Sequence, residues 1–293
     1  MAKTADRITS AVLGRLATRA VRPCGALSRW RVLHSRCGLL ESVILHPDGR
    51  LFFTSQTRRA LLRLDAPDAE PVPVATGVLA PGGLAVAGDG RLILGFGDSP
   101  RGGIAGNVSP RAGLVLVDPS GGGVEPWVQG LGMANGVARA SDGTVFASND
   151  FGTHLDRVAP DGTVERRWAK VVSANGLVVD AAGRYVYAAQ TFTRAAIRRV
   201  EIARPQNVTV HARPPLGAML SFLDGLAIDV AERLYVAVNG AGQVWRIDPD
   251  GRICAIARGL GSPSAVAVGR PGTPFPDLYA VTFGGDVIEI AGP

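Results

Sequence analysis

Residues 135–146 read Asn-Gly-Val-Ala-Arg-Ala-Ser-Asp-Gly-Thr-Val-Phe. An apolar stretch leads into an Asp-Gly pair and a second apolar stretch follows, which predicts two strands joined by a tight turn. The same template returns in five other places, with the turn residue always eight positions after the first residue (143 − 135, for example). The copies begin at Glu41, Gly82, Asn135, Asn175, Asp224 and Ser264, and the last is followed by a proline-rich insertion.

The spacing of these copies decides the fold class. Their first residues, at 41, 82, 135, 175, 224 and 264, lie 41, 53, 40, 49 and 40 residues apart. Further apolar stretches such as residues 113–118 and 243–248 supply two more strands for each copy. About forty residues and four strands per copy are typical of a propeller blade, so we expect an all-β, six-bladed β-propeller. A solenoid is the alternative, but the polar capping repeats that it needs are missing.

The ring is expected to close between the two ends of the repeat region, with Val32 and Leu33 pairing with the strands around residues 279–290. Residues 1–36 are interpreted as a separate basic extension, and residues 37–293 as the propeller. A short amphipathic helix is expected over residues 8–21 of the extension. Its apolar stripe consists of Ile8, Val12, Leu13 and Leu16.

Charge is concentrated in the extension. The chain has 31 basic and 25 acidic residues. Residues 1–36 hold eight of the basic residues and one of the acidic ones, so 23 basic and 24 acidic residues remain in the body. A neutral body argues against a nucleic-acid partner. The extension is either a helix lying across the body or a frayed end, or else an Arg-rich mitochondrial presequence.

No run of 18 apolar residues predicts a membrane-spanning helix, and no apolar core of a secretory signal is present. The three cysteines are Cys24, Cys37 and Cys254. A Cys24–Cys37 disulfide is possible from the spacing, but reduced thiols and a cytoplasmic location are the expectation. The oligomeric state is left open.

Equivalent repeat positions lie on a ring at one mouth of a propeller channel. The first template position therefore aims four oxygen-bearing side chains at the axis, namely Glu41, Asn135, Asn175 and Asp224. Such a cluster, with a charge of −2, favours a hard divalent cation with room left for water and substrate. The alternative is ordinary turn chemistry, because Asn and Asp before Gly tolerate turn positions well.

These residues also carry a family resemblance. Residues 37–290 resemble the senescence-marker-protein/gluconolactonase family, which includes regucalcin and luciferin-regenerating enzymes, through Glu41, Ala134-Asn135-Gly136, Ala174-Asn175-Gly176 and Leu223-Asp224-Gly225. The resemblance implies a six-bladed propeller with one divalent metal held by Glu41, Asn135, Asn175 and Asp224, and Asp224 as the candidate general base. Calcium is the expected ion, with magnesium, manganese, zinc and iron as alternatives.

Two departures from the family pattern concern the substrate. Ser42-Val43 stands where the family usually has Gly-Pro, and Met133 stands where sugar-lactone members often carry an arginine. An arginine would hydrogen-bond a polyol, whereas methionine offers a flexible apolar wall. Met219, Phe222 and Phe192 are candidates to extend this wall. The expected substrate is therefore a lactone or ester less polar than gluconolactone.

Three further residues are candidate substrate contacts beside Met133 and Phe222. Asn149, Asp150 and His154 lie in one loop that can reach the same mouth. For His154 the alternative is a solvent-facing or packing side chain. The long insertion after Leu94 is expected to form either a lid or a surface loop.

The function that follows is a metal-dependent lactonase, a carboxylic-ester hydrolase in which the cation polarises the carbonyl. The attacking water is activated either by Asp224 or by the cation itself. Three alternatives remain: a paraoxonase-like arylesterase, a strictosidine-synthase-like propeller enzyme, and a propeller binding module without catalysis.

Overall fold

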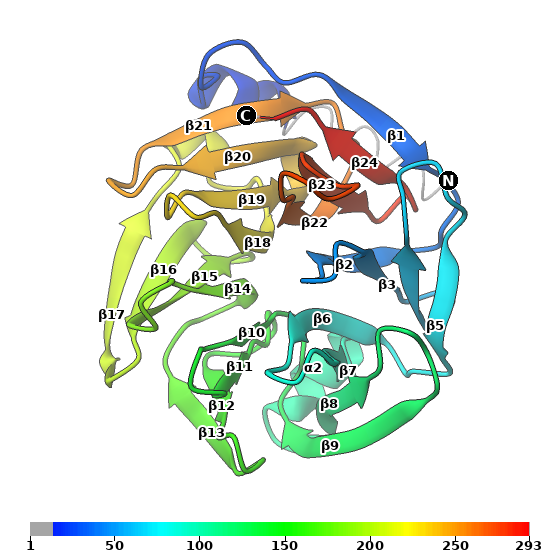
Figure 1. Ribbon diagram of the computed structural model, residues 1–293. Helices are drawn as coiled ribbons and strands as arrows, with labels where there is room; N and C mark the ends of the chain where they lie inside the picture. The colour runs from blue at the N-terminus through cyan, green and yellow to red at the C-terminus, as the bar shows by residue number, and fades with distance from the viewer. Residues whose placement is uncertain (1–13, 293) are drawn as a thin grey trace.

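The computed structural model describes residues 14–292, and they form six four-stranded antiparallel sheets arranged around a channel (Figure 1). The predicted six-bladed β-propeller is confirmed. From the channel outward, blade 1 contains β2 (Leu40–Leu45), β3 (Leu51–Ser55), β4 (Ala60–Leu64) and β5 (Val72–Thr76). Blade 2 contains β6 (Pro81–Val86), β7 (Leu92–Phe96), β8 (Ala112–Val117) and β9 (Val124–Leu131). Blade 3 contains β10 (Val137–Arg139), β11 (Val145–Ala147), β12 (Leu155–Val158) and β13 (Val164–Ala169).

Blades 4 to 6 follow the same plan. Blade 4 contains β14 (Ala174–Val179), β15 (Tyr185–Gln190), β16 (Ala196–Glu201) and β17 (Arg204–Ala212). Blade 5 contains β18 (Leu223–Ile228), β19 (Leu234–Val238), β20 (Gln243–Ile247) and β21 (Ile253–Arg258). Blade 6 contains β22 (Pro263–Val268), β23 (Leu278–Thr282), β24 (Val287–Ile290) and β1 (Trp30–His34). Short helices occur at α2 (Pro100–Gly106), η1 (Leu216–Ala218) and η2 (Asn239–Ala241).

The turn that was predicted from the repeat is a hairpin on the side of the ring away from α2. Asp48 Oδ1 accepts a hydrogen bond from the backbone N–H of Arg50 at 3.0 Å, and Gly49 adopts φ 92°. Asp89 and Gly90 repeat this geometry in blade 2. The N–H of Gly49 donates to the carbonyl of His46 at 2.9 Å, so a tight turn is followed by a glycine with positive φ, which is typical of a three-residue hairpin loop.

The glycines that follow the ring positions have a different role. A Cβ on Gly136 would lie 2.2 Å from the backbone oxygen of Asn175, and one on Gly176 would lie 2.4 Å from the backbone nitrogen of Leu226. Gly83 and Gly225 meet the next blade in the same way. These residues therefore have no side chain because the innermost strands of neighbouring blades touch there, and the glycines of the motifs Asn-Gly and Asp-Gly mark these strand contacts.

The ring closes as the sequence predicts. β1 pairs antiparallel with β24, with Trp30 opposite Ile290 and Val32 opposite Ile288. This strand lies within the segment 1–36 that the sequence analysis separates from the propeller, so the end of that segment belongs to the sixth blade. The closed ring leaves the edge of β24 covered.

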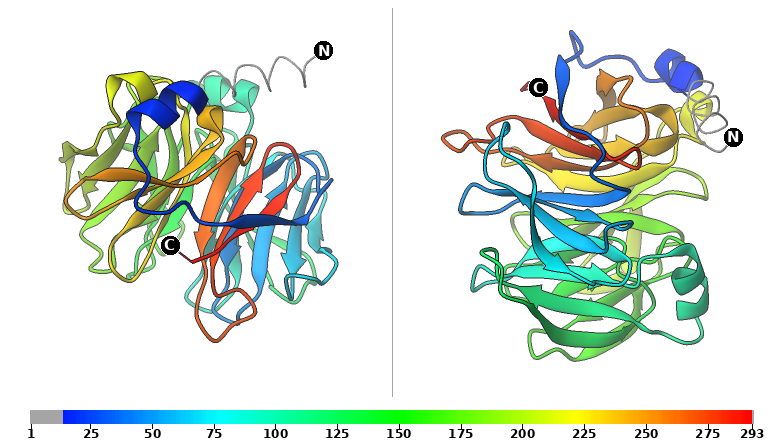
Figure 2. Two further views of the ribbon diagram at one scale, coloured as in Figure 1. Left: turned by 90° about the horizontal axis from the view of Figure 1, so that it is seen from above. Right: turned by 90° about the vertical axis from the view of Figure 1, so that its right-hand side faces the viewer.

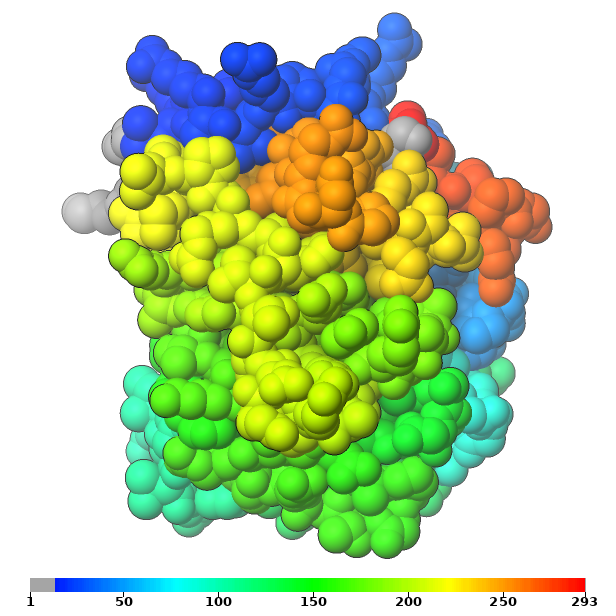
Figure 3. Space-filling model, turned by 90° about the vertical axis from the view of Figure 1, so that its left-hand side faces the viewer, coloured from blue at the N-terminus to red at the C-terminus, as the bar shows by residue number. Residues whose placement is uncertain are grey.

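Residues 14–29, which precede β1, run along the outer edge of the ring (Figure 3). Residues 14–20 are helical, and Ala17 and Val21 are buried in a cluster that includes Trp245. Leu16, which the sequence places on the apolar stripe of this helix, is 48% exposed. The other stripe residues, Ile8, Val12 and Leu13, lie outside the described residues. Within residues 14–292, no helix has the length and apolarity to cross a membrane.

A disulfide between Cys24 and Cys254 ties this segment to β21, and the N–H of Cys24 donates to the carbonyl of Ala255 at 3.0 Å. Cys37 is a free, buried thiol. Both sequence-based interpretations, a Cys24–Cys37 pair and fully reduced thiols, are therefore wrong. The two cysteines are 230 residues apart in sequence and meet only because the segment folds back along blade 5. Disulfides persist in oxidising compartments, so the cytoplasmic location loses the argument on which it rested.

The close strand contact at Gly136 can be tested by Gly136→Ala. The added methyl group would overlap the neighbouring backbone, so we expect the free energy of unfolding to fall by about 2 kcal/mol or more. Gly25→Ala is the control, since a Cβ there has no neighbour within 4 Å. Equal unfolding midpoints for the two variants in urea would contradict this packing.

Candidate functional site

The four predicted ring residues converge at the mouth of the channel on the side that carries α2. Glu41, Asn175 and Asp224 lie near the start of the innermost strands β2, β14 and β18, and Asn135 lies two residues before β10. All four are less than a tenth exposed, at 8%, 5%, 4% and 7% respectively. Asn135 Nδ2 donates to Glu41 Oε1 at 3.1 Å.

The remaining two ring positions, Gly82 and Ser264, do not leave an opening in the ring. Ser264 is fully buried, and its Oγ donates to the carbonyl of Leu40 at 2.7 Å. At Gly82, an added Cβ would lie 2.8 Å from the Cβ of Asp98. The absent side chain of Gly82 is therefore replaced in space by the side chain of Asp98, which reaches in from the end of β7.

Asp98 was not predicted as a site residue. It is 2% exposed, and its carboxylate accepts hydrogen bonds from Asn135 Nδ2 at 3.1 Å and from Gln56 Nε2 at 2.7 Å. The N–H of Asp98 binds the carbonyl two residues before Gly82, and the N–H of Gln56 binds the carbonyl two residues before Glu41. Gln56 and Asp98 thus occupy equivalent positions just after the second strand of their blades, and such positions form a second ring around the channel. Comparing those strand ends between repeats, as well as their starts, would have found Asp98.

Asp150, a predicted substrate contact, also belongs to the acidic cluster. It is 8% exposed, and burial together with the charge of Asp98 raises the pKa of its carboxyl to about 7. Burial likewise raises the pKa of Asp98 to about 7, although hydrogen bonds from Asn135 and Gln56 favour its charged form. Four carboxyl groups therefore face one small volume.

The pKa values of the two ring carboxyls, Glu41 and Asp224, are raised most. Burial and the charges of Asp98, Asp224 and Asp150 raise the pKa of Glu41 well above its ordinary value. Burial, Asp150 and Asp98 do the same for Asp224, against a smaller opposing effect of the Asn175 amide. Charged carboxylates at this spacing are unfavourable unless protons or a cation neutralise them.

The donor set fits a cation. One carboxylate oxygen of Asp224 and one of Asp150 are buried without a hydrogen-bond partner. Within residues 14–292, no three acidic, histidine or cysteine side chains come close enough together to hold an ion alone. An ion at this ring would therefore also need the amide oxygens of Asn135 and Asn175, which matches the all-oxygen preference of calcium and magnesium.

The acidic cluster forms the floor of a cavity of about 330 Å³ with an apolar wall. Met133 and Phe222, both predicted substrate contacts, line it together with Phe151 and Phe192. The Phe192 ring lies 5.3 Å from the Phe151 ring and 6.0 Å from the Phe222 ring, centroid to centroid. Met219, a candidate for the same wall, is not among the lining residues.

Two other predicted contacts lie elsewhere. Asn149 donates through Nδ2 to the carbonyl of Gly103 at 2.9 Å and accepts from the N–H of Phe151, so it fastens α2 to its own loop. His154 lies beside Thr153 at a separate small pocket with Arg166 and Arg167. Burial and nearby positive charges lower the pKa of His154. The structure does not bring either side chain into the cavity.

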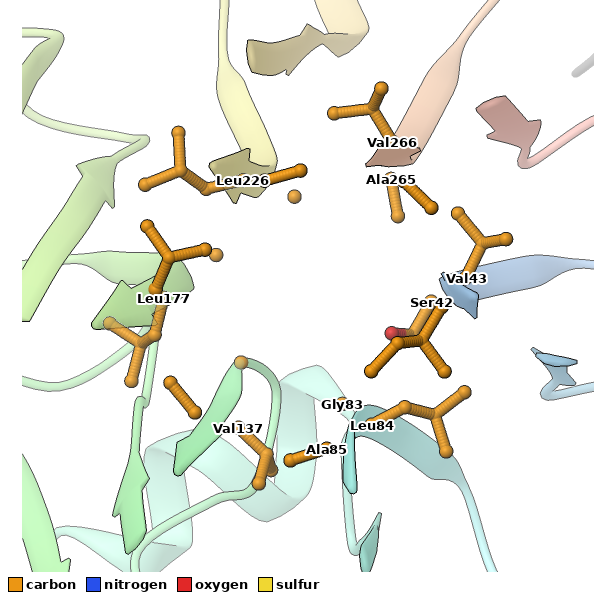
Figure 4. A pocket seen from close by; sticks show the side chains of 18 of the residues that line it. Ser42, Val43, Gly83, Leu84, Ala85, Val137, Leu177, Leu226, Ala265 and Val266 are labelled. Atoms are coloured by element: carbon orange, nitrogen blue, oxygen red, sulfur yellow. The ribbon is translucent and has the colours of Figure 1, made fainter. Parts of the chain in front are cut away.

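The opposite mouth of the channel has a different chemistry. It opens into a cavity of about 340 Å³ whose walls are mainly aliphatic, with Val43, Leu84, Leu177 and Leu226 from blades 1, 2, 4 and 5 (Figure 4). Ser42 is the one polar side chain labelled there. Glu41, Asn135 and Asn175 form its inner end, so the polar ring separates the two cavities.

Fold and site together define a six-bladed propeller with buried oxygen donors at one mouth of its channel. Among solved structures, a gluconolactonase from Xanthomonas campestris has a TM-score of 0.74 at 17% identity, covering 94% of this chain and 93% of that one. Regucalcin from Agrobacterium tumefaciens has a TM-score of 0.70 at 18% identity, with 91% and 96% covered. A luciferin-regenerating enzyme has a TM-score of 0.68 at 14% identity, with 90% and 95% covered. At these identities the likeness establishes the fold.

The family match is more specific. Residues 147–283 match the model of the SMP-30/gluconolactonase/LRE-like region, and this confirms the family resemblance that the sequence motifs predict. The matched residues include Asn175 and Asp224, while Glu41 and Asn135 precede them. A comparison with curated protein sequences gave no match.

Asp150→Asn tests the crowding of carboxyl groups. An unfolded aspartate loses its proton near pH 4, whereas burial raises the pKa of Asp150 to about 7, so the folded state holds more protons between these values. Stability of the ion-free protein therefore falls as pH rises through this window. We expect the variant to gain on the order of 2 kcal/mol in unfolding free energy at about pH 8, and little at about pH 4.

The control is Asp68→Asn, an exposed aspartate on the opposite side of the ring. Urea unfolding in the presence of a chelator gives the free energies. A gain in unfolding free energy that is independent of pH, or that Asp68→Asn reproduces, would show that burial and the charge of Asp98 do not raise the pKa of Asp150.

Proposed function

We propose that this protein is a divalent-metal-dependent hydrolase that opens a lactone less polar than gluconolactone. The observation that carries the proposal is the placement of Glu41, Asn135, Asn175 and Asp224 at the floor of an apolar-walled cavity. The family match over residues 147–283 supports a lactonase-type activity. Neither feature suits a propeller that only displays a binding surface, because buried carboxyls destabilise a fold that does not use them.

Glu41, Asn135, Asn175 and Asp224 would hold the cation, with Asp98 orienting Asn135 through its hydrogen bond. Calcium suits an all-oxygen set of carboxylates and amides, and the Agrobacterium relative is described as a calcium-binding protein. Magnesium and manganese share this preference, while zinc and iron favour nitrogen and sulfur ligands more strongly. When bound, the cation would polarise the ester carbonyl and stabilise the negative charge that develops on its oxygen.

Asp224 is the proposed general base. One of its oxygens has no partner, although the residue is 4% exposed, so it is available to a water molecule in the cavity. The carboxylate accepts a proton as the water oxygen bonds to the carbonyl carbon, and the ring C–O bond then breaks. The proton passes to the departing ring oxygen, so that the products are one hydroxyl group and one carboxyl group.

The side chains of the cavity wall support the proposed preference for a less polar substrate. Met133 is buried against α2, where an added Cβ on Gly103 would lie 2.7 Å from its sulfur, so it is a fixed apolar surface. Phe222 and the half-exposed Phe192 continue this surface toward solvent. The wall offers no charged side chain to the hydroxyl groups of a sugar, which favours a lactone with an aliphatic or aromatic substituent.

Asp224→Ala tests the site assignment. We expect lactone hydrolysis to fall about a thousandfold or more, because both a metal ligand and the base are removed. Elemental analysis of chelator-stripped protein offered calcium, magnesium, manganese, zinc and ferrous iron should find about one ion per wild-type chain and none in the variant. Asp286→Asn, a substitution outside the cavity, is the matched control.

Near-normal turnover in Asp224→Ala, with its thermal unfolding intact, would refute the assignment of the base and the ligand together. A wild-type protein that binds no ion of this panel would refute the metal-dependent mechanism.

Phe192→Ser tests the preference for apolar lactones. Removing the ring from the wall should lower kcat/KM for an alkyl-substituted lactone about tenfold and leave that for gluconolactone unchanged. Val210→Ser, on the outer strand β17, is the control. A variant that loses both activities equally would show that Phe192 acts on folding or on the reaction and not on substrate choice.

A further inference from the structure

The antiparallel blades divide all connecting segments between two faces. Each innermost strand begins beside the acidic cavity, so the second and fourth strands of a blade end on that side. The connections that leave these strands lie on the face that carries α2, here called the α2 face. The hairpins between the first and second strands, and between the third and fourth, lie on the opposite face. Figure 2 shows α2 and the N-terminal helix on the same side of the ring.

The two faces carry opposite charge. The connecting segments on the α2 face contain eight arginine or lysine residues and three aspartates, of which Asp98 and Asp150 are buried in the cavity. The connecting segments on the opposite face contain six arginines and fourteen acidic residues. The net charge of the connecting segments is therefore +5 (8 − 3) on the α2 face and −8 (6 − 14) on the opposite face. Arg15 and Arg19 of the N-terminal helix add to the positive side.

The arginines of the two faces also differ in their partners. On the opposite face, five of the six form ion pairs with nearby aspartates, such as Arg184 with Asp180 and Arg252 with Asp248. Among residues 14–292, none of the eight basic residues in the α2-face connections forms an ion pair. These charges are consequently available to an external anion.

Exposed apolar side chains gather on the same face. Seven large ones project from the α2-face connections, whereas the opposite-face connections carry Val230 alone. The most exposed are Val108 at 91% and Leu216 at 89%, followed by Leu79 and Leu220 at 65% each. The seven lie on five connecting segments of the α2 face, and two of them, Phe192 and Phe283, also line the cavity. Monomeric proteins rarely expose apolar side chains in this concentration unless the surface binds something.

We propose that the α2 face docks on the surface of a lipid bilayer that contains anionic lipids, with the cavity mouth turned toward the lipid. The arginines would contact phosphate groups, and the apolar tips would enter the boundary between headgroups and acyl chains. An acidic protein or a nucleic acid would match the positive charge but would offer no apolar phase to tips that lie on five separate segments. Phe192 and Phe283 belong to both the apolar surface and the cavity lining, so the docked cavity opens directly onto the bilayer.

The inference goes beyond the proposed hydrolase activity, since docking is measured without a substrate. Full-length protein is sedimented with vesicles of phosphatidylcholine alone or of phosphatidylcholine mixed with phosphatidylglycerol. We expect binding to the mixed vesicles, weaker binding to the neutral ones, and release by added salt. The double variant Val108→Ser, Leu216→Ser should bind about tenfold more weakly or worse, and so should Arg101→Glu, Arg194→Glu.

Matched controls on the opposite face are Val230→Ser and the pair Arg184→Glu, Arg252→Glu, which should bind like the wild type. Thermal unfolding checks that every variant is folded. The absence of binding to phosphatidylglycerol vesicles at low salt would overturn the proposal. So would controls that weaken binding as much as the α2-face variants. Vesicle binding that depends on Arg101 and Arg194 but not on Val108 and Leu216 would also overturn it, because it would show adsorption by charge alone without entry of the apolar side chains.

Discussion

The close approach of the innermost strands is the constraint on which the site depends. Neighbouring strands meet backbone to backbone at Gly83, Gly136, Gly176 and Gly225, where even a methyl group has no room. The residue before each of these glycines is thereby held near the axis, on a strand whose position the next blade fixes. A ring of polar side chains assembled from four different blades keeps its geometry only because these contacts leave the strands little freedom.

The same convergence creates an electrostatic conflict. Glu41, Asp98, Asp150 and Asp224 are drawn into a space from which water is largely excluded. Burial raises the pKa of all four, and the charges of neighbouring carboxylates add to the shift for Glu41, Asp150 and Asp224. A fold that keeps such a cluster must neutralise it with protons or a cation, and the apolar wall above strengthens every charge interaction inside. Stability and binding at this mouth are therefore coupled, because whatever neutralises the floor also stabilises the ring.

The sequence predicts what repeats and misses what depends on the path of the chain. Glu41, Asn135, Asn175 and Asp224 were found because equivalent positions of a repeat occupy one ring. Asp98 comes from a different repeat position, and its side chain fills the space beside Gly82. The sequence repeat alone shows only that Gly82 has no side chain. The bond between Cys24 and Cys254 follows from the course of an N-terminal segment that belongs to no repeat. Asn149 has a residue type suited to binding a substrate, but α2 takes up its amide.

The closure of the sixth blade has a consequence for how the protein is made. β1 comes from the beginning of the chain and β24 from its end, so their hydrogen bonds form only after synthesis has reached residue 290. Until then β22 and β23 have no complete sheet, and β1 remains without its partner strand. Such long-range pairing is slow compared with local hairpins. The pairing of β1 with β24 is thus a late step of folding, whereas Cys24 needs only β21 to be in place before it can meet Cys254.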